Sequence, residues 1–265
     1  MIRVLVTGAC GRMGKEVCRG VMRNAELELA AAVDVVNVGM DLGELFGEKS
    51  WGIAVTSDLR TAIENARPHV VVDFTNSTAA LMNARIAAEA GLPLVIGTTG
   101  MTAAQVDELH TLAEEREVGI LLVPNFALGA VLMMHFARIA ARYFPYVEIV
   151  EMHHEQKLDA PSGTALKTAE VILEAREQAP EPKVQEFERL QGCRGGDYQG
   201  IRIHSIRLPG YVAHQEVIFG GTGQTLTIRH DSTSREAFIP GVILAIKEAQ
   251  NIRGLVYGLE HILRL

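Results

Sequence analysis

The sequence predicts an α/β protein in which a Rossmann-like domain with a parallel sheet is joined to a second α+β domain with a mostly antiparallel sheet. Three observations support this prediction. Apolar, strand-like segments alternate with helical patterns through the first half of the chain, a glycine-rich turn links the first strand to the first helix, and beyond residue 125 a long helix precedes several alternating strands. Repeated β–α units imply a parallel sheet with right-handed crossovers.

The first half contains five apolar segments that we expect to be buried strands, at residues 2–7, 27–33, 70–74, 93–97 and 119–123. Helical patterns lie between them at residues 12–24, 58–65, 77–90 and 102–117. Gly91 directly follows the third of these helices, where a left-handed cap is expected.

After Asn125 the pattern changes. Helices are expected at residues 128–143, 162–178 and 237–250, and strands at 147–153, 201–208, 215–219 and 225–230. Residues 179–199 are polar and rich in proline and glycine, so we expect an exposed loop there.

Composition narrows the class of protein. The formal net charge is −7 and no dense basic run occurs, which argues against a nucleic-acid partner. The cysteine count is odd, 3, and no CxxC pair is present, so a reducing, cytoplasmic compartment is expected. The chain opens on a strand-like run rather than a signal peptide, and its most apolar stretch, residues 119–136, is broken by Pro124, Asn125 and Gly129. We therefore expect no membrane span.

The motif Gly8-x-x-Gly11-x-x-Gly14 directly follows a strand and precedes a helix, which is the context of a dinucleotide loop. Glycines let the backbone turn sharply and let a pyrophosphate approach, while the N–H groups of the helix start attract its charge. The spacing departs from the common G-x-G-x-x-G, because Ala9 occupies the first position of that register. A glycine-rich turn without a ligand is the alternative.

Asp34 lies twenty residues after Gly14, at the end of the second strand, where a carboxylate accepts hydrogen bonds from the adenosine ribose. A carboxylate there disfavours a 2′-phosphate, and Val35 and Val36 supply no compensating arginine. The sequence therefore favours NADH over NADPH, although Arg12 could contact a phosphate.

Two later segments also follow strands. Gly97-Thr98-Thr99-Gly100 and Pro124-Asn125-Phe126 lie at carboxyl ends of the predicted parallel sheet, where ligands bind in open α/β folds. Both could line the nicotinamide side of a cofactor site, and each alone is also typical of an ordinary turn.

Polar chemistry is concentrated between residues 151 and 164. His153 and His154 end a strand, so their side chains point to opposite sides, and Lys157 follows in a loop. Ser162, Gly163 and Thr164 then open a helix, where hydroxyls and N–H groups form an anion site. The set suits a carboxylate or dicarboxylate substrate, and a histidine or lysine could donate a proton to an atom reduced by hydride.

Each part of this segment also has a structural explanation. The adjacent histidines lack a matching cysteine or carboxylate cluster, so no metal site is expected. Lys157 alone would be a solvated lysine, and the Ser-Gly-Thr run a helix cap. Further along the chain we expect structural or subunit contacts rather than carboxylate contacts from Arg207, His214 and His230, and we retain Arg235 as a weak substrate-binding candidate.

The sequence resembles the 4-hydroxy-tetrahydrodipicolinate reductases (dihydrodipicolinate reductases) of bacterial lysine biosynthesis. The resemblance covers essentially the whole chain, and its most specific part is the run His-His-x-x-Lys-x-Asp-Ala-Pro-Ser-Gly-Thr. The other matching motifs are Gly8-x-x-Gly-Arg-Met-Gly14, Val72-Asp73-Phe74, Gly97-Thr-Thr-Gly100, Asn125-Phe126, Arg207-Leu-Pro-Gly210 and Glu216-Val-Ile-Phe219.

The resemblance implies a dinucleotide-binding domain of residues 1–126 and 239–265, and a substrate-binding and oligomerisation domain of residues 127–238 whose sheet builds a homotetramer. It implies reduction of (2S,4S)-4-hydroxy-2,3,4,5-tetrahydrodipicolinate to (S)-2,3,4,5-tetrahydrodipicolinate by NADH or NADPH, in lysine and diaminopimelate biosynthesis.

Matched position by position, the resemblance implies that His153 is a proton donor/acceptor and Lys157 a proton donor. It implies that His154, Gly163 and Thr164 hold the substrate carboxylates. The residues it implies for the cofactor are Gly8, Ala9, Cys10, Gly11, Arg12, Met13, Asp34, Gly97, Thr98, Thr99, Val123, Pro124, Asn125 and Phe126. Family members that favour NADPH can carry an arginine where this chain has Val35, which leaves the cofactor preference open.

Two other functions remain as alternatives. An amino-acid dehydrogenase of the aspartate type would show amino-acid-dependent reduction of NAD. A catalytically silent dinucleotide sensor would keep its function without the His153 or Lys157 side chain, but such a sensor needs no proton donor beside a nicotinamide.

Overall fold

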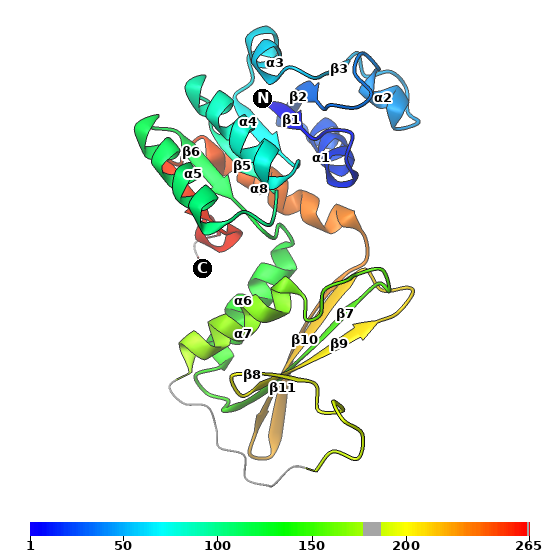
Figure 1. Ribbon diagram of the computed structural model, residues 1–265, viewed down its shortest axis with the longest axis vertical. Helices are drawn as coiled ribbons and strands as arrows, with labels where there is room; N and C mark the ends of the chain where they lie inside the picture. The colour runs from blue at the N-terminus through cyan, green and yellow to red at the C-terminus, as the bar shows by residue number, and fades with distance from the viewer. Residues whose placement is uncertain (177–186, 264) are drawn as a thin grey trace. The chain divides into compact units, whose positions relative to one another are not determined.

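The computed structural model describes residues 1–176, 187–263 and 265. The chain forms two compact units (Figure 1). The first unit comprises Met1–Phe126 with Phe238–Leu265, and the second comprises Ala127–Ala237. Phe238 thus belongs to the first unit, one residue away from the boundary expected from the sequence.

The first unit is built on a seven-stranded parallel sheet with the order β12-β6-β5-β4-β1-β2-β3. From β1 to β3 successive strands are added towards one edge of the sheet, and from β4 to β6 they are added towards the other edge. In open α/β sheets ligands bind at the carboxyl ends of the strands that flank the point of reversal, here β1 and β4. The strands are β1 (Ile2–Thr7), β2 (Leu27–Val33), β3 (Val55–Thr56), β4 (Val70–Asp73), β5 (Leu94–Ile96), β6 (Gly119–Leu122) and β12 (Gly254–Tyr257).

Helices cover both faces of this sheet (Figure 1), which explains why its strands are apolar throughout. On one face α3 (Leu59–Ala66), α4 (Ser77–Glu89) and α5 (Ala103–Glu115) bury Leu109 and a series of alanines against the strands. On the other face α1 (Arg12–Arg23) packs against α8 (Ile239–Ala249).

The predicted helices differ from the observed ones mainly at their ends, because polar residues counted as helical are caps. Asp58 and Thr102 accept N–H groups at the starts of α3 and α5, whereas α4 begins at Ser77 as predicted, with Asn76 as its cap. Gly91 has a φ of +71°, which confirms the expected left-handed cap after α4.

Four short elements of the first unit were not predicted, and the last of them is the 3₁₀ turn η2 (Leu259–His261). Helix α2 (Leu42–Leu45) and strand β3 lie between β2 and α3, and β12 adds a seventh strand by pairing in parallel with β6. Asp41 organises the region around α2, since its carboxylate accepts hydrogen bonds from the N–H groups of Gly43, Glu44, Trp51 and Ile53. Such short elements depend on tertiary partners rather than on periodicity.

The second unit contains a five-stranded mixed sheet with the order β11-β10-β7-β9-β8. Only the β7–β9 pairing is parallel among these strands, so the sheet is mostly antiparallel, as predicted. The strands are β7 (Tyr146–His153), β8 (Gly196–Tyr198), β9 (Ile201–Arg207), β10 (Ala213–Gly221) and β11 (Gln224–Ser232).

Helices α6 (Leu128–Ala140) and α7 (Gly163–Ala175) pack on one face of this sheet, over Ile149, Val217 and Phe219 (Figure 1). Helix α6 is shorter than expected because residues 141–143 form a turn. Within the expected loop 179–199, residues 196–198 instead form β8, while residues 179–186 lie outside the described residues, as do 177 and 178 of the expected helix. The expected helix 237–250 begins only at Ile239, because residues 237 and 238 belong to a 3₁₀ turn, η1 (Arg235–Phe238).

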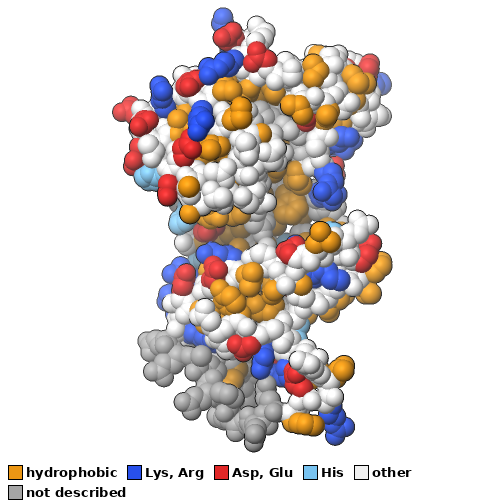
Figure 2. Space-filling model, in the orientation of Figure 1, with side chains coloured by type: hydrophobic (Ala, Val, Ile, Leu, Met, Phe, Trp, Pro, Cys, Tyr) orange, Lys and Arg blue, Asp and Glu red, His pale blue; other side chains and the backbone are white. Residues whose placement is uncertain are grey.

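Acidic and basic side chains are interspersed over the face of both units that Figure 2 shows. A single-signed surface of the kind that attracts a polyanion is therefore not seen on that face. Within the described ranges, no helix has the length and apolar character needed to cross a bilayer.

Candidate active site

The glycine loop of the first unit is packed so closely that two of its glycine positions cannot hold a side chain. Gly8 has a φ of +72°, and a Cβ there would lie 2.5 Å from the carbonyl oxygen of Phe74. A Cβ at Gly14 would lie 2.0 Å from the carbonyl oxygen of Gly8. The start of α1 therefore rests directly on the loop, and only glycine fits at these two positions.

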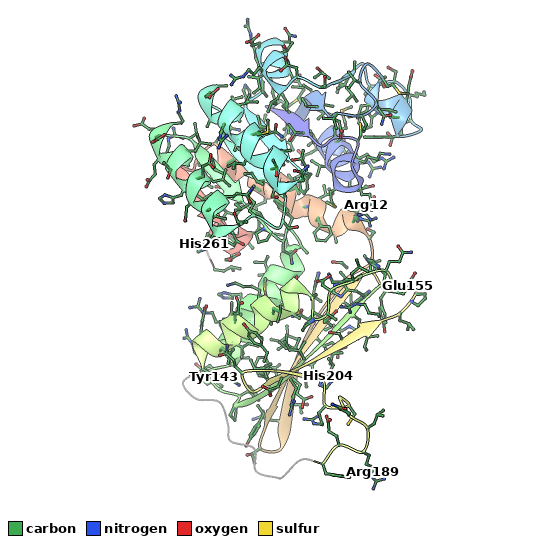
Figure 3. All side chains as sticks on the ribbon, in the orientation of Figure 1. Arg12, Tyr143, Glu155, Arg189, His204 and His261 are labelled. Carbon is green, nitrogen blue, oxygen red and sulfur yellow. The ribbon has the colours of Figure 1, made fainter. Side chains whose placement is uncertain are left out.

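The N-terminus of α1 has no side-chain cap, in contrast to α3, α4 and α5. Gly11 occupies the N-cap position, the first turn contains no acidic residue, and exposed Arg12 begins the helix (Figure 3). The first N–H groups of a helix need external acceptors. This uncapped start fits the pyrophosphate of a dinucleotide.

Asp34 follows β2 beside the glycine loop. Its Oδ2 accepts the N–H of Cys10 at 2.8 Å, and its Oδ1 accepts the N–H of Val36 at 3.2 Å. A carboxylate has about four acceptor positions, so two remain for ribose hydroxyls. Asp34 therefore braces the loop and can still bind a ligand.

Asp73, at the end of β4, was given no role from the sequence, yet it organises the neighbouring loops. It is fully buried and accepts hydrogen bonds from Thr7 Oγ1 at 2.6 Å, Asn83 Nδ2 at 2.7 Å and Thr98 Oγ1 at 3.0 Å. Thr75 donates both its N–H and its hydroxyl to the same carboxylate. A lone acidic residue ending a buried strand was the sequence signal for this network.

This network changes what Thr98 can offer a cofactor. Its side chain is buried and bonded to Asp73, so only its backbone remains available to a ligand. Gly97 is tightly enclosed, because a Cβ there would lie 2.2 Å from the ring of Phe74. Thr99 is exposed.

The other expected cofactor residues differ in accessibility. The side chains of Ala9, Val123 and Phe126 are buried, and Phe126 packs on Phe74 with ring centroids 5.6 Å apart. These three can contact a ligand only through their backbones. Cys10, Met13 and Asn125 are half-buried, and Pro124 is exposed.

The predicted catalytic segment of the second unit is organised by Glu151. Glu151, which was given no role of its own from the sequence, lies two residues before His153 on β7 and is fully buried. It is joined to His153 Nδ1 at 2.5 Å, and its Oε1 accepts the backbone N–H of Ser162 at 3.2 Å. Arg207 donates two hydrogen bonds to it, at 2.9 and 2.8 Å.

The charge state of Glu151 determines the tautomer of His153. Burial by itself would raise the pKa of Glu151, but hydrogen bonds from His153, Arg207 and Ser205 hold that pKa at about 2. The carboxylate is thus ionised at neutral pH and acts only as an acceptor. Nδ1 of His153 must therefore carry a hydrogen, which leaves Nε2 as the nitrogen that exchanges a proton.

Lys157 lies beyond β7 and pairs with Asp159. Its Nζ lies 2.8 and 2.9 Å from the two carboxylate oxygens, and the hydrogen bond from Lys157 holds the pKa of Asp159 below its usual value. The carbonyl oxygen of Asp159 in turn accepts a hydrogen bond from Arg207 at 2.7 Å. Lys157 is thereby connected to the Glu151–His153 pair, and its ammonium retains a third N–H for a ligand.

The start of α7 combines a structural cap with an open position. Ser162 is buried and its hydroxyl accepts the N–H of Ala165, so it is the helix cap. Gly163 is exposed, and no atom lies within 4 Å of where its Cβ would be. Thr164 is half-buried at the next position, and His154 is half-buried directly after β7.

The remaining candidates lie apart from this network. His214 pairs with Asp231 at 2.5 Å, and the ring of His230 packs against Gly129. Arg235 is exposed in η1 and has no hydrogen-bond or ion-pair partner among the residues that the structure describes. No hydrogen bond or ion pair among the described residues links Arg235 to Glu151 or His153. In the described parts of the chain, no group of three or more potential ligand residues is arranged to hold a metal ion.

Comparison with known proteins places these two sites in one family. Two family models match the chain: dihydrodipicolinate reductase, N-terminus, over residues 2–126, and dihydrodipicolinate reductase, C-terminus, over residues 129–263. A curated relative from Moorella thermoacetica, 4-hydroxy-tetrahydrodipicolinate reductase, is 57% identical over 99% of this chain and 98% of that protein.

The solved structure of dipicolinate-bound dihydrodipicolinate reductase from Paenisporosarcina sp. TG-14 is 46% identical, with a TM-score of 0.89 over 98% of this chain and 99% of that one. Aspartate dehydrogenase from Thermotoga maritima superposes with a TM-score of 0.52 over 94% of this chain and 96% of that one, but at 10% identity it shares the fold alone. This chain therefore belongs to the dihydrodipicolinate reductase family of NAD(P)H-dependent oxidoreductases.

Proposed function

We propose that this chain reduces (2S,4S)-4-hydroxy-2,3,4,5-tetrahydrodipicolinate to (S)-2,3,4,5-tetrahydrodipicolinate in lysine and diaminopimelate biosynthesis. The conversion releases one water and adds one hydride and one proton to the ring. The observation that carries the proposal is the polar network at the end of β7, in which His153, Lys157 and the start of α7 are linked through Glu151 and Arg207.

When bound, NADH or NADPH supplies the hydride. We assign the pyrophosphate to the uncapped start of α1 and the adenosine ribose to Asp34, supported by the tight glycine loop and the spare acceptor positions of that carboxylate. The backbones of the Gly97–Thr99 and Val123–Phe126 segments would line the rest of the site. The absence of an arginine after Asp34 favours NADH.

The substrate's two carboxylates are assigned to the start of α7 and to His154. The N–H of Gly163 is open to a ligand, and Thr164 follows it in the first helical turn. Ser162 contributes by capping and holding this turn rather than by its hydroxyl. Arg235 stays a candidate for a further carboxylate contact.

Protons are assigned to two groups. His153 exchanges a proton at Nε2, because its Nδ1–H is engaged by Glu151. Lys157 donates a proton from its ammonium, whose position is set by Asp159. Both groups are close to the open start of α7 in the hydrogen-bonded network, which supports their acting on one substrate.

The family likeness further supports a homotetramer assembled through the sheet of the second unit and acting in the cytoplasm. Apolar side chains on the face of this sheet away from α6 and α7, including Tyr146 and Ile206, are more than a third exposed, which favours burial against another copy.

The decisive test is a steady-state assay of nicotinamide oxidation with the lysine-pathway precursor and either NADH or NADPH. We expect turnover only when the precursor is present. L-Aspartate with NAD serves as the alternative reaction, and we expect none. Aspartate-dependent NAD reduction without turnover of the precursor would replace this proposal with an amino-acid dehydrogenase.

A further inference from the structure

We propose that Glu151 is a positioning residue, which fixes the tautomer of His153 and ties that imidazole ring to the start of α7. This inference rests on the proposed function of His153 in proton transfer. It concerns a side chain that touches neither substrate nor cofactor and acts through its neighbour.

The surroundings of Glu151 are suited to this role. On β7 it shares a face with His153, and this face is covered by helices rather than solvent. In the sheet register Ser205 of β9 and Gln215 of β10 lie opposite it, and Arg207 lies opposite His153. The side chain of Glu151 is 0% exposed and that of His153 15%.

Charge is balanced at this position. The charged groups that face the pair are Arg207 on β9 and, through Arg207, the Lys157–Asp159 ion pair of the following loop. Strand β10 contributes Gln215 and α7 contributes Ser162 and Thr168, which are uncharged. Because Arg207 offsets the negative charge of Glu151, the carboxylate can stay ionised inside the protein and orient the imidazole.

One carboxylate therefore joins three parts of the site. It accepts the imidazole N–H of His153, the N–H at the cap of α7, and the fork of Arg207, which also holds the carbonyl of Asp159. The imidazole ring of His153 and the proposed anion-binding start of α7 are consequently both held by the carboxylate oxygens of Glu151. An imidazolium formed at His153 also gains a neighbouring anion.

The chain contains a matched control on the same strand. Glu148 lies on the opposite face of β7 and is joined to His204 at 2.8 Å and to Arg194 at 2.6 Å. Figure 3 shows His204 on the sheet, away from Glu155 in the loop that follows His153. Glu148→Gln thus removes the charge from a glutamate–histidine–arginine cluster outside the proposed site, and size-exclusion chromatography checks that both glutamine variants keep the wild-type assembly.

The first experiment compares Glu151→Gln with Glu148→Gln in steady-state kinetics across pH. For Glu151→Gln we expect kcat to fall by about 100-fold or more, the lower range of a general acid–base contribution. NADH binding should be unchanged, and the pH profile of kcat should differ in shape from that of wild type because the imidazole loses the carboxylate that orients it. Glu151→Asp should recover part of the rate. A wild-type rate and pH profile in Glu151→Gln, or equal losses in both glutamine variants, would overturn the proposal.

A second experiment needs neither a variant of Glu151 nor turnover. Nitrogen-15 NMR of histidine-labelled wild-type protein reports which ring nitrogen of neutral His153 carries hydrogen, with His153→Gln used to assign the signal. We expect hydrogen on Nδ1, and hydrogen on Nε2 would contradict the proposal. Failure of the protein to reduce the precursor would instead refute the proposed function and leave this measurement intact.

Discussion

The glycine loop at the start of α1 and the polar segment at the start of α7 are both proposed to receive anions, but they are held in place differently. The first is shaped by missing side chains: Gly8 and Gly14 allow backbone to contact backbone, and no side chain caps the helix. The second is held by side chains, with Ser162 as the cap and buried Glu151 behind it.

This difference determines how each site should fail. The glycine loop, which is formed by backbone, should be disrupted by added side-chain atoms. The site at the start of α7, which is held by side chains, should be disrupted when those groups are removed or neutralised. Changes in the first unit should therefore affect cofactor binding, and changes around β7 should affect turnover while leaving cofactor binding intact.

The largest expected effect is that of Lys157→Ala. We expect turnover to fall by about 100- to 10,000-fold, since a proton donor is removed, while NADH binding persists. Stopped-flow or steady-state rates and NADH fluorescence titration measure the two effects. Lys167→Ala, which removes an exposed lysine paired with Glu170 on α7, is the control and should retain activity. Full activity of Lys157→Ala would remove this lysine from the mechanism.

Gly14→Ala should impair the glycine loop of the first unit. Its new Cβ would meet the backbone of Gly8 and Ala9 within 3 Å, so α1 must move away from the loop. We expect the KM for NADH to rise by about 10- to 100-fold, because a displacement of about 1 Å in a positioned site costs that much. Gly220→Ala, where the nearest atom is 3.7 Å from the Cβ, is the matched control. An unchanged KM in Gly14→Ala would show that the loop does not position the cofactor.

Val35→Arg should change the cofactor preference by adding a positive charge beside the glycine loop without disturbing the loop itself. Val35 is 85% exposed and directly follows Asp34, so an arginine is accommodated and can pair with a 2′-phosphate. We expect kcat/KM for NADPH relative to NADH to rise about tenfold, the value of about 1.4 kcal/mol of new interaction. Val38→Arg, at a 51% exposed position of the same segment, should change this ratio less. Equal ratios in both variants would place the adenosine end of the cofactor elsewhere.

The last expected effect is on stability in acid rather than on activity. The pKa of Glu151 is about 2 in the folded protein against 4.5 for a free side chain, so the unfolded state binds the proton more readily. Its contribution to the free energy of unfolding is therefore present above about pH 4.5 and is lost as the pH falls towards 2. Urea unfolding of wild type and Glu151→Gln between these pH values measures it. The variant should show a shallower pH dependence, and parallel curves would contradict the expectation.

Much of the fold follows from local signals. Apolar runs located the five central strands of the parallel sheet, and caps such as Asp58 and Thr102 set helix starts within a residue or two. The helices and strands that were missed, α2, β3, β8, β12 and η2, have four residues or fewer, and β12 exists because it pairs with β6 from the far end of the chain. No short window of sequence contains that pairing.

By itself, the sequence determined that the chain has a dinucleotide-type loop, a His-His-x-x-Lys segment and the family likeness, because these depend on residue type and close spacing. Only the tertiary structure decided that Thr98 turns inward to Asp73, that Ser162 is a cap, and that Arg207, 56 residues away, holds the Glu151 carboxylate that bonds to His153. The physical reason is that burial and hydrogen-bond partners are set where distant strands meet. A buried carboxylate acquires its role from the donors that surround it, and the fold alone brings those donors together.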